Sequence, residues 1–232
     1  MSDPLADLAE LEGVPSALTA ARDAADAVLR DRGLRRITPE QSAAALVAGA
    51  RASAELEEKA TGVDSGHWTA GAVRMSTELV PLAALIRVSP GQVLARLHTL
   101  VAREVAGETA GTLRDDPEVS HRMVGLNQLL SRSGRVSALV LAAVAHGEVA
   151  SLTPFGTADG IVARAVEHLV LIEAGVDPRG ALVPEAGHLA AGPRYATLLA
   201  GYADGSVAGV RDWILHCAQA LTRGAEVSPL RG

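Results

Sequence analysis

Apolar residues recur along the chain at the spacing of helices more often than at the alternation typical of strands. In one segment, the spacing i, i+1, i+4, i+7, i+8 gathers on one helix face Val93, Leu94, Leu97, Leu100 and Val101. Near the C-terminus, a second stripe comprises Val207, Val210, Ile214, Cys217 and Leu221. Each stripe predicts a helix that buries one face against the rest of the protein.

Several segments carry residues that begin or end helices. Thr38, Pro39 and Gln41 occupy the N-cap, N1 and N3 positions of a capping box, which predicts a helix running to about Lys59. The segment 89–92, Ser-Pro-Gly-Gln, repeats this device before the first apolar stripe.

Proline and glycine mark further helix ends. We expect an earlier helix to begin near Pro15 and to stop at Gly33, and Pro193 restarts a helix late in the chain. The stretch 107–117 is polar and interrupts the helical pattern. It is compatible with a turn or with a short hairpin near 107–122.

The most apolar part of the chain lies between 136 and 173. The segment Val136–Ala145 predicts a helix buried on most sides, although a buried strand has the same pattern. A loop rich in Thr, Pro, Gly and Asp follows at 151–160. An apolar helix is then expected from Ile161 to Glu173, stopped by Gly175 and Pro178.

Composition supports a helical fold. The length of 232 residues favours a single domain. Hydrophobic residues make up 48% of the chain but aromatic residues only 2%, so the core must consist of Ala, Val and Leu, which favours closely packed helices over a β-sandwich. We predict an all-α fold, with a leader helix in residues 1–38 and the main domain in residues 39–224.

Charge and cysteine content exclude several classes of function. A net charge of −6 argues against nucleic acid as a partner, because the phosphate-neutralising surface is missing. No apolar run approaches the ~18 residues of a membrane span, and no basic region precedes an apolar run at the N-terminus, so we expect a cytoplasmic protein away from the membrane. Cys217 is the single cysteine, which excludes an internal disulfide or a multi-cysteine metal site. We expect no metal and no cofactor.

One loop followed by a helix has the makings of an anion site. Small residues lead into a predicted helix N-terminus, and Arg164 lies about one turn further on. Free backbone N–H groups, the helix dipole and a guanidinium together attract an anion. The alternative is that Thr157 or Asp159 caps the helix and Arg164 pairs with a nearby carboxylate.

This loop resembles the signature of Fic (Fido-fold) proteins, H-P-F-x-[DE]-G-N-G-R-x-x-R. Four residues match it in register: Pro154, Phe155, Gly160 and Arg164. Further stretches resemble other parts of that family, namely 94–98, 111–114, 169–178, 195–199 and 213–221. The resemblance covers roughly residues 53 to 221 and implies a Fic-like helical bundle.

Departures from the signature change the expected activity. The resemblance implies transfer of AMP from ATP to a protein hydroxyl, with the signature His as general base and the acidic residue holding Mg²⁺. Thr153 stands at the His position and Thr157 at the acidic position, while Asp159 and Ile161 replace the Asn and the first Arg. A threonine hydroxyl is protonated at neutral pH and cannot take the place of imidazole.

We therefore predict a catalytically degenerate Fic-like protein, a pseudoenzyme that acts as a binding or regulatory module on an unknown protein partner. The alternative is a nucleotide-binding protein or a nucleotidyl (AMP) transferase with an atypical active site, using Arg164 and a base from elsewhere, such as His146 or Glu148. A third alternative is an unrelated helical bundle with a small-molecule pocket.

A second motif bears on regulation. The segment 53–58 resembles the inhibitory helix of many Fic proteins, [ST]-x-x-x-E-[GN], with Glu58 in place of the final Gly or Asn. The resemblance implies that Glu57 pairs with Arg164 across the old nucleotide site. The alternative is an ordinary charged helix, in which Glu55 and Lys59 form an i,i+4 surface pair.

Three histidines lie on predicted helices. His146 and Glu148 have the H-x-E spacing of zinc deaminases, but the cysteine motif that such enzymes require is absent. We expect His146 to end a buried helix and to bond a nearby carbonyl, and we expect the same of His98 and His168.

Overall fold

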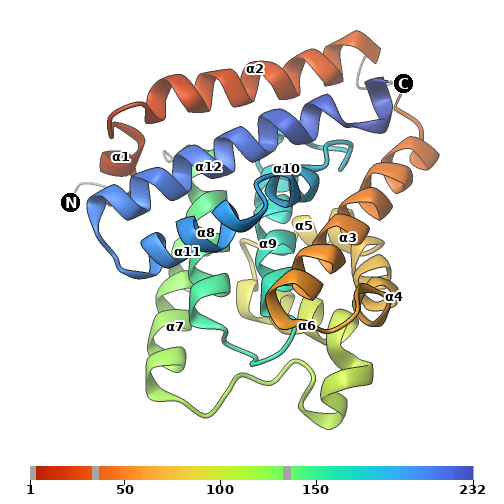
Figure 1. The fold of residues 1–232 in the computed structure, drawn as a ribbon, viewed down its shortest axis with the longest axis vertical. Coiled ribbons are helices and arrows are strands. Elements are labelled where there is room, and N and C mark those ends of the chain that lie inside the picture. Colours follow the sequence, from red (N-terminus) through yellow and green to blue (C-terminus); the bar gives the residue numbers. More distant parts are fainter. Residues whose placement is uncertain (1–3, 33–36, 133–136, 232) are drawn as a thin grey trace.

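Helices form all the regular structure in residues 4–32, 37–132 and 137–231, the parts of the chain that the computed structural model describes (Figure 1). The α-helices are α1 (Pro4–Ala9), α2 (Val14–Arg32), α3 (Pro39–Thr61), α4 (Ser65–Ser76), α5 (Leu79–Ala83), α6 (Pro90–Ala106), α7 (Pro117–Ser131), α8 (Ala138–Leu152), α9 (Asp159–Glu173), α10 (Pro184–Ala190), α11 (Pro193–Ala203) and α12 (Val207–Glu226). Over these residues the prediction of an all-α fold is confirmed.

The centre of the bundle is the pair α8 and α9, which pack on each other and are surrounded by the other helices (Figure 1). Every residue of α9 from Ile161 to Ile172 is buried. The apolar run before it forms α8, so the predicted helix is confirmed and the buried strand is wrong. The start of that run, Val136, lies outside the described residues.

Two long helices cover one side of this centre. Helix α2 runs along α12 (Figure 1), and its small residues Ala21 and Ala25 are buried at the contact. Helix α2 begins one residue before Pro15, as expected, whereas the predicted stop at Gly33 lies outside the described residues.

The predicted stripe of α12 holds over most of its length but fails at the start. Ile214, Cys217 and Leu221 are buried, whereas Val207 is 67% exposed. The whole corner 203–208 between α11 and α12 is exposed, and Val207 lies in it.

The two predicted helix starts differ in detail. At α3 the capping box is confirmed, because Thr38 Oγ1 accepts a hydrogen bond from the Gln41 amide and the Thr38 amide donates to Gln41 Oε1. Helix α6 begins as predicted, and its apolar stripe is buried. The Ser89 side chain makes no cap bond within the described chain, so only the backbone and Pro90 mark that start.

The short hairpin near 107–122 does not form in the described residues. A single 3₁₀ turn at Gly107–Thr109 is followed by irregular chain, and α7 begins at Pro117 with Asp116 as its N-cap. The Arg114 amide donates to the Pro154 carbonyl over 2.8 Å, so this segment is joined to the loop after α8, while its own backbone bonds close only short turns. The prediction missed α10 as well, a helix of seven residues that starts at Pro184.

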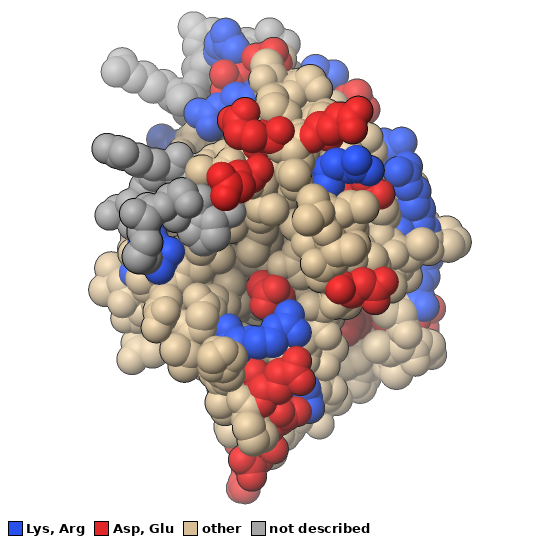
Figure 2. Space-filling model, turned by 90° about the vertical axis from the view of Figure 1, so that its left-hand side faces the viewer, with Lys and Arg blue, Asp and Glu red and all other residues tan. Residues whose placement is uncertain are grey.

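On the face shown in Figure 2, Lys and Arg side chains lie beside Asp and Glu side chains in mixed groups, and uncharged surface separates these groups. Within the described residues, no helix is long and apolar enough to cross a membrane.

Helices α11 and α12 meet at two glycines, and the contact is one-sided. A Cβ on Gly209 would lie 1.9 Å from the Gly201 carbonyl oxygen, whereas a Cβ on Gly201 would meet only the Gly209 Cα at 3.7 Å. We therefore expect Gly209→Ala to lower the free energy of unfolding by about 1–3 kcal/mol, as overpacking does.

Gly201→Ala is the matched control for that substitution. It should leave stability unchanged or raise it by up to about 1 kcal/mol, since alanine is the better helix former. Urea unfolding of both variants measures the difference, and equal losses would contradict the one-sided contact.

Candidate functional site

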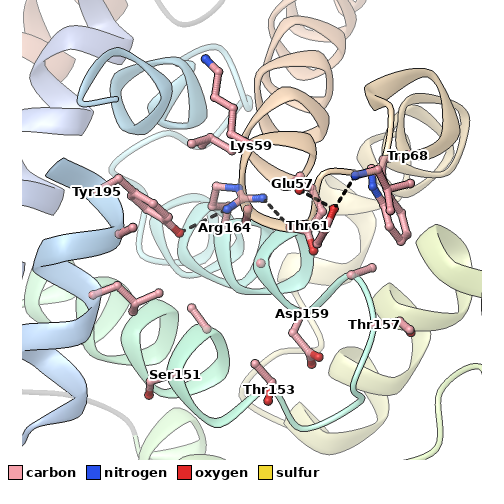
Figure 3. Close-up of a pocket in the computed structure, with 18 of the residues that line it drawn as sticks. Glu57, Lys59, Thr61, Trp68, Ser151, Thr153, Thr157, Asp159, Arg164 and Tyr195 are labelled. Carbon is pink, nitrogen blue, oxygen red and sulfur yellow. Dashed lines mark hydrogen bonds and ion pairs between the residues drawn. The ribbon is translucent and has the colours of Figure 1, made fainter. Parts of the chain in front are cut away.

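A cavity of about 820 Å³ opens between the second half of α3, the start of α4, the loop 153–158, the start of α9 and one face of α11 (Figure 3). Residues predicted for the site that line it are Glu57, Thr153, Thr157, Asp159, Gly160 and Arg164. The other two signature residues, Pro154 and Phe155, are buried and do not line the cavity. The fold thus brings most of the predicted site to one cleft.

The loop 153–158 is held in an unusual backbone conformation. Thr153 has φ 46° and Ala158 has φ 53°, both in the left-handed region, and Gly156 has φ 80°. A β-branched residue in that region is strained, and such strain persists only where surrounding contacts impose it.

Two side chains from outside the loop impose this shape. Arg114 donates to the carbonyl oxygens of Thr153 (2.8 Å) and Leu152 (3.1 Å). His98 bonds the Thr157 carbonyl through Nε2 at 3.1 Å and stacks on the Phe155 ring. The expected carbonyl bond of His98 is confirmed. Both side chains come from stretches that resemble the Fic family, but the sequence alone did not indicate that they brace the loop.

Arg164 is 2% exposed, and each of its three guanidinium nitrogens has a partner. Figure 3 shows its contacts with Glu57 and Tyr195. Its Nε donates to Ser53 Oγ (2.7 Å), its Nη1 to Tyr195 OH (3.2 Å), and its Nη2 to the Ser53 carbonyl (3.0 Å) and Glu57 Oε2 (3.2 Å). The contact that the pairing hypothesis required is therefore present. The role in inhibition stays a prediction.

The alternative pair on the same helix is also present. Lys59 donates to Glu55 Oε1 over 2.8 Å on the exposed side of α3. Helix α3 thus turns Glu57 toward the cleft and Glu55 toward solvent, so both interpretations describe real contacts.

The anion site predicted at the start of α9 is filled by the protein itself. A Cβ on Gly160 would lie only 2.5 Å from Glu57 Oε2 and 3.2 Å from Arg164 Nη1. The Glu57 carboxylate therefore lies against the first turn of α9 and against the guanidinium. Both the helix dipole and Arg164 stabilise a negative charge there.

Neither residue that we expected to cap α9 does so. The N-cap position is Ala158, which makes no side-chain cap bond within the described residues. Asp159 Oδ1 turns back to accept from the Phe155 amide at 2.9 Å, and the Thr157 hydroxyl faces His98 Nε2 at 3.2 Å. The Asp159 carboxylate thus accepts a bond from within the loop, and the Thr157 hydroxyl contacts a side chain of α6.

Asp159 is only 4% exposed, and its environment disfavours the charged form. Burial, together with the nearby Glu57 carboxylate, raises the pKa of Asp159 to about 7, although the Phe155 and Gly156 amides and Arg114 act in the opposite direction. The carboxyl group is thus close to half-protonated at neutral pH.

The bases proposed for an atypical enzyme lie away from the cleft. His146 is fully buried, with Glu167 on Nδ1 and Tyr195 OH on Nε2 at 2.8 Å, so the expected carbonyl bond is wrong. Burial lowers the pKa of His146 to about 4. Glu148 pairs with Arg122 at 3.0 Å, and neither His146 nor Glu148 lines the cavity.

The prediction for His168 is wrong in the same way. Its ring nitrogens contact the carboxylates of Glu185 (2.9 Å) and Asp177 (3.0 Å) instead of a carbonyl. These partners come from the segment after α9, so spacing along one helix could not indicate them.

Comparison with solved structures finds the same architecture in a Fic family protein from Desulfovibrio desulfuricans G20. That crystal structure superposes with a TM-score of 0.70, covers 90% of this chain and 73% of its own chain, and shares 16% sequence identity. Neither a scan against protein-family models nor a search of curated proteins finds a match. The protein therefore has the Fic fold.

The raised pKa of Asp159 predicts a pH dependence of stability. Because the folded-state pKa lies above the unfolded value, the contribution of Asp159 to stability is complete below the unfolded pKa and is lost as pH rises through about 7. Asp159→Asn keeps the acceptor for the Phe155 amide but never ionises. We expect its stability advantage over the wild type to grow by about 1–3 kcal/mol between pH 5 and pH 8.

Urea unfolding at the two pH values measures this advantage. Asp115→Asn, at an exposed position in the segment before α7, is the control and should show the same small difference at both. A pH-independent effect of Asp159→Asn would contradict the burial argument.

Proposed function

We propose that this protein is a catalytically degenerate member of the Fic fold that acts by binding in its cleft and does not transfer AMP. The observation that carries the proposal is the state of Arg164. Each of its guanidinium nitrogens donates a hydrogen bond to Ser53, Glu57 or Tyr195, and the Glu57 carboxylate fills the anion position beside it. A nucleotide phosphate would have to displace a buried ion pair before it could bind.

The chemistry of the loop points the same way. Thr153 and Thr157, at the positions of the base and the magnesium ligand, offer neutral hydroxyl groups that neither accept a proton at neutral pH nor hold Mg²⁺ well. Loss of a general base alone typically lowers a rate by about 10²–10⁴-fold. Asp159 and Glu57 add two acidic groups where phosphates would carry negative charge.

The cavity suits an uncharged, largely apolar ligand. Its apolar wall consists of Leu56, Val63, Val105, Ala150, Ala196, Leu199, Ala200 and Ala203. Its volume lies in the range of about 300–1,000 Å³ typical of small-molecule sites. Trp68 lines the cavity too, and its Nε1 has no hydrogen-bond partner among the described residues, so a ligand with one acceptor would satisfy a buried donor. The protein partner of such a module stays a prediction.

A second candidate is nucleotide binding or AMP transfer with an atypical active site. One observation favours it: an imidazole, that of His67, lines the cavity beside Trp68. The filled anion position opposes it, and the two candidates differ in what they predict for ATP.

The first test is a titration with ATP and with AMP, with and without Mg²⁺, followed by the melting temperature. We expect no shift, because the Glu57 carboxylate holds the anion position at the first turn of α9. A true ligand at about 100 times its dissociation constant would add about 2.7 kcal/mol. A reproducible rise, or an AMP adduct on any target in intact-mass analysis, would overturn the proposal in favour of the second candidate.

The second test uses Nile red as an uncharged apolar probe of the cleft. We expect the dye to bind the wild type with a rise in fluorescence, and Ala196→Phe, which fills the cavity from α11, to weaken its affinity at least about tenfold. Thr197→Phe is the matched control, because Thr197 is exposed on the same helix and does not line the cavity. No binding by the wild type, or equal loss in both variants, would contradict an apolar cleft.

A further inference from the structure

Four side chains with metal-binding atoms meet in the core, away from the cleft. They come from four helices: His146 on α8, Glu167 on α9, His188 on α10 and Cys217 on α12. Their donor atoms all lie within 4.8 Å of one another, and each side chain is at most 4% exposed. No pattern along the chain shows this cluster, because its members are brought together only by the packing of the bundle.

We propose that this cluster is a buried site for a divalent transition metal, with Zn²⁺ as the ion that its donors fit best. The ligands are His146 Nδ1, His188 Nε2, a carboxylate oxygen of Glu167 and Cys217 Sγ. Two imidazoles, a carboxylate and a thiolate form a four-coordinate set of the nitrogen, oxygen and sulfur donors that zinc takes in proteins. The proposal departs from the expectation of no metal, and it is consistent with the exclusion of a multi-cysteine site, because only one ligand is a cysteine.

The geometry needs only side-chain adjustment. Tetrahedral bonds of about 2.0–2.3 Å place the ligand atoms about 3.3–3.8 Å apart. Glu167 Oε2 now accepts from both imidazoles, from His188 Nε2 at 2.8 Å and from His146 Nδ1 at a shorter distance. An ion bound among these atoms would lengthen the two Glu167–imidazole distances. It would shorten the largest separation between donor atoms, which is at most 4.8 Å, by about 1 Å. Cys217, on α12, supplies the fourth ligand of the tetrahedron.

Charge balance favours the ion. The Glu167 carboxylate is 2% exposed, and within the described chain it forms ion pairs with the two imidazoles and with no Lys or Arg. A carboxylate and a thiolate together carry two negative charges, and a divalent cation carries two positive charges. The bound site is therefore neutral, which matters because an isolated charge is costly in a buried region.

The surroundings already orient both imidazoles. His146 Nε2 contacts Tyr195 OH at 2.8 Å, and His188 Nδ1 contacts His216 Nε2 at 3.0 Å. Metal-ligating imidazoles in proteins almost always have their second nitrogen hydrogen-bonded in this way, which sets the tautomer. On binding, each imidazole keeps one proton, on the nitrogen that faces Tyr195 or His216. The thiol proton of Cys217 leaves to solvent as the sulfur–metal bond forms.

The test is metal content and cobalt spectroscopy on the full chain. Because the site is enclosed, the protein is loaded in two ways: by expression with added zinc chloride, and by unfolding in urea and refolding with zinc chloride or cobalt chloride. We expect one metal per chain after dialysis, and a melting temperature raised by roughly 5 °C or more over the metal-free protein. The cobalt form should show tetrahedral visible bands and a thiolate-to-metal charge-transfer band.

Variants locate the site. Cys217→Ala, a small change in a packed position, should remove the charge-transfer band and lower zinc affinity at least about tenfold, as loss of a ligand does. His188→Gln should lower zinc affinity as well. His121→Ala, at an exposed histidine of α7, is the matched control and should keep both metal and spectrum.

Two results would overturn the proposal. One is a folded wild type that retains no metal after either loading. The other is a bound metal whose cobalt spectrum lacks the thiolate band in the wild type, which would place the ion elsewhere without relying on any variant. Either result would leave the proposal for the cleft untouched, because the cleft residues that carry it are not ligands.

Discussion

The buried guanidinium of Arg164 ties together the parts of the molecule that form the cleft. It belongs to the central helix α9, and its partners Ser53 and Glu57 come from α3 while Tyr195 comes from α11. Removing a guanidinium from water is expensive unless all its donors are satisfied. Here each of the three nitrogens donates at least one hydrogen bond, and the four bonds go to a hydroxyl, a carbonyl, a carboxylate and a phenol. This one side chain therefore joins α3, α9 and α11 by hydrogen bonds.

That constraint also decides what the cleft can do. With Glu57 held against the first turn of α9, the positive end of the helix and the guanidinium are both neutralised from within. What remains open to a ligand is the apolar surface of α11 and the end of α3. Because a fold does not by itself imply a function, what this cleft can bind depends on the side chains that line it.

Polar contacts continue from Arg164 into the core. Tyr195 OH lies 3.2 Å from Arg164 Nη1 and 2.8 Å from His146 Nε2, so one phenol joins the cleft to the histidine cluster behind it. From there the contacts run through Glu167 to His188. The interior of an otherwise aliphatic bundle thus carries a continuous polar path, and Trp213 packs edge-on against His146 beside it.

The sequence by itself determined the features that depend on near neighbours along the chain. The capping box at Thr38, the apolar stripe of α6 and the buried run of α8 follow from local spacing. The fold and the Glu57–Arg164 contact do not; the resemblance to the Fic family indicated both, the contact through the segment 53–58. The tertiary structure alone decided the rest. The segment 107–122 pairs with the loop after α8, Gly209 fits against a carbonyl of α11, and the cluster around Glu167 assembles from four helices. These depend on how helices distant in sequence pack, because burial and side-chain partners are set by neighbours in space, which local periodicity does not encode.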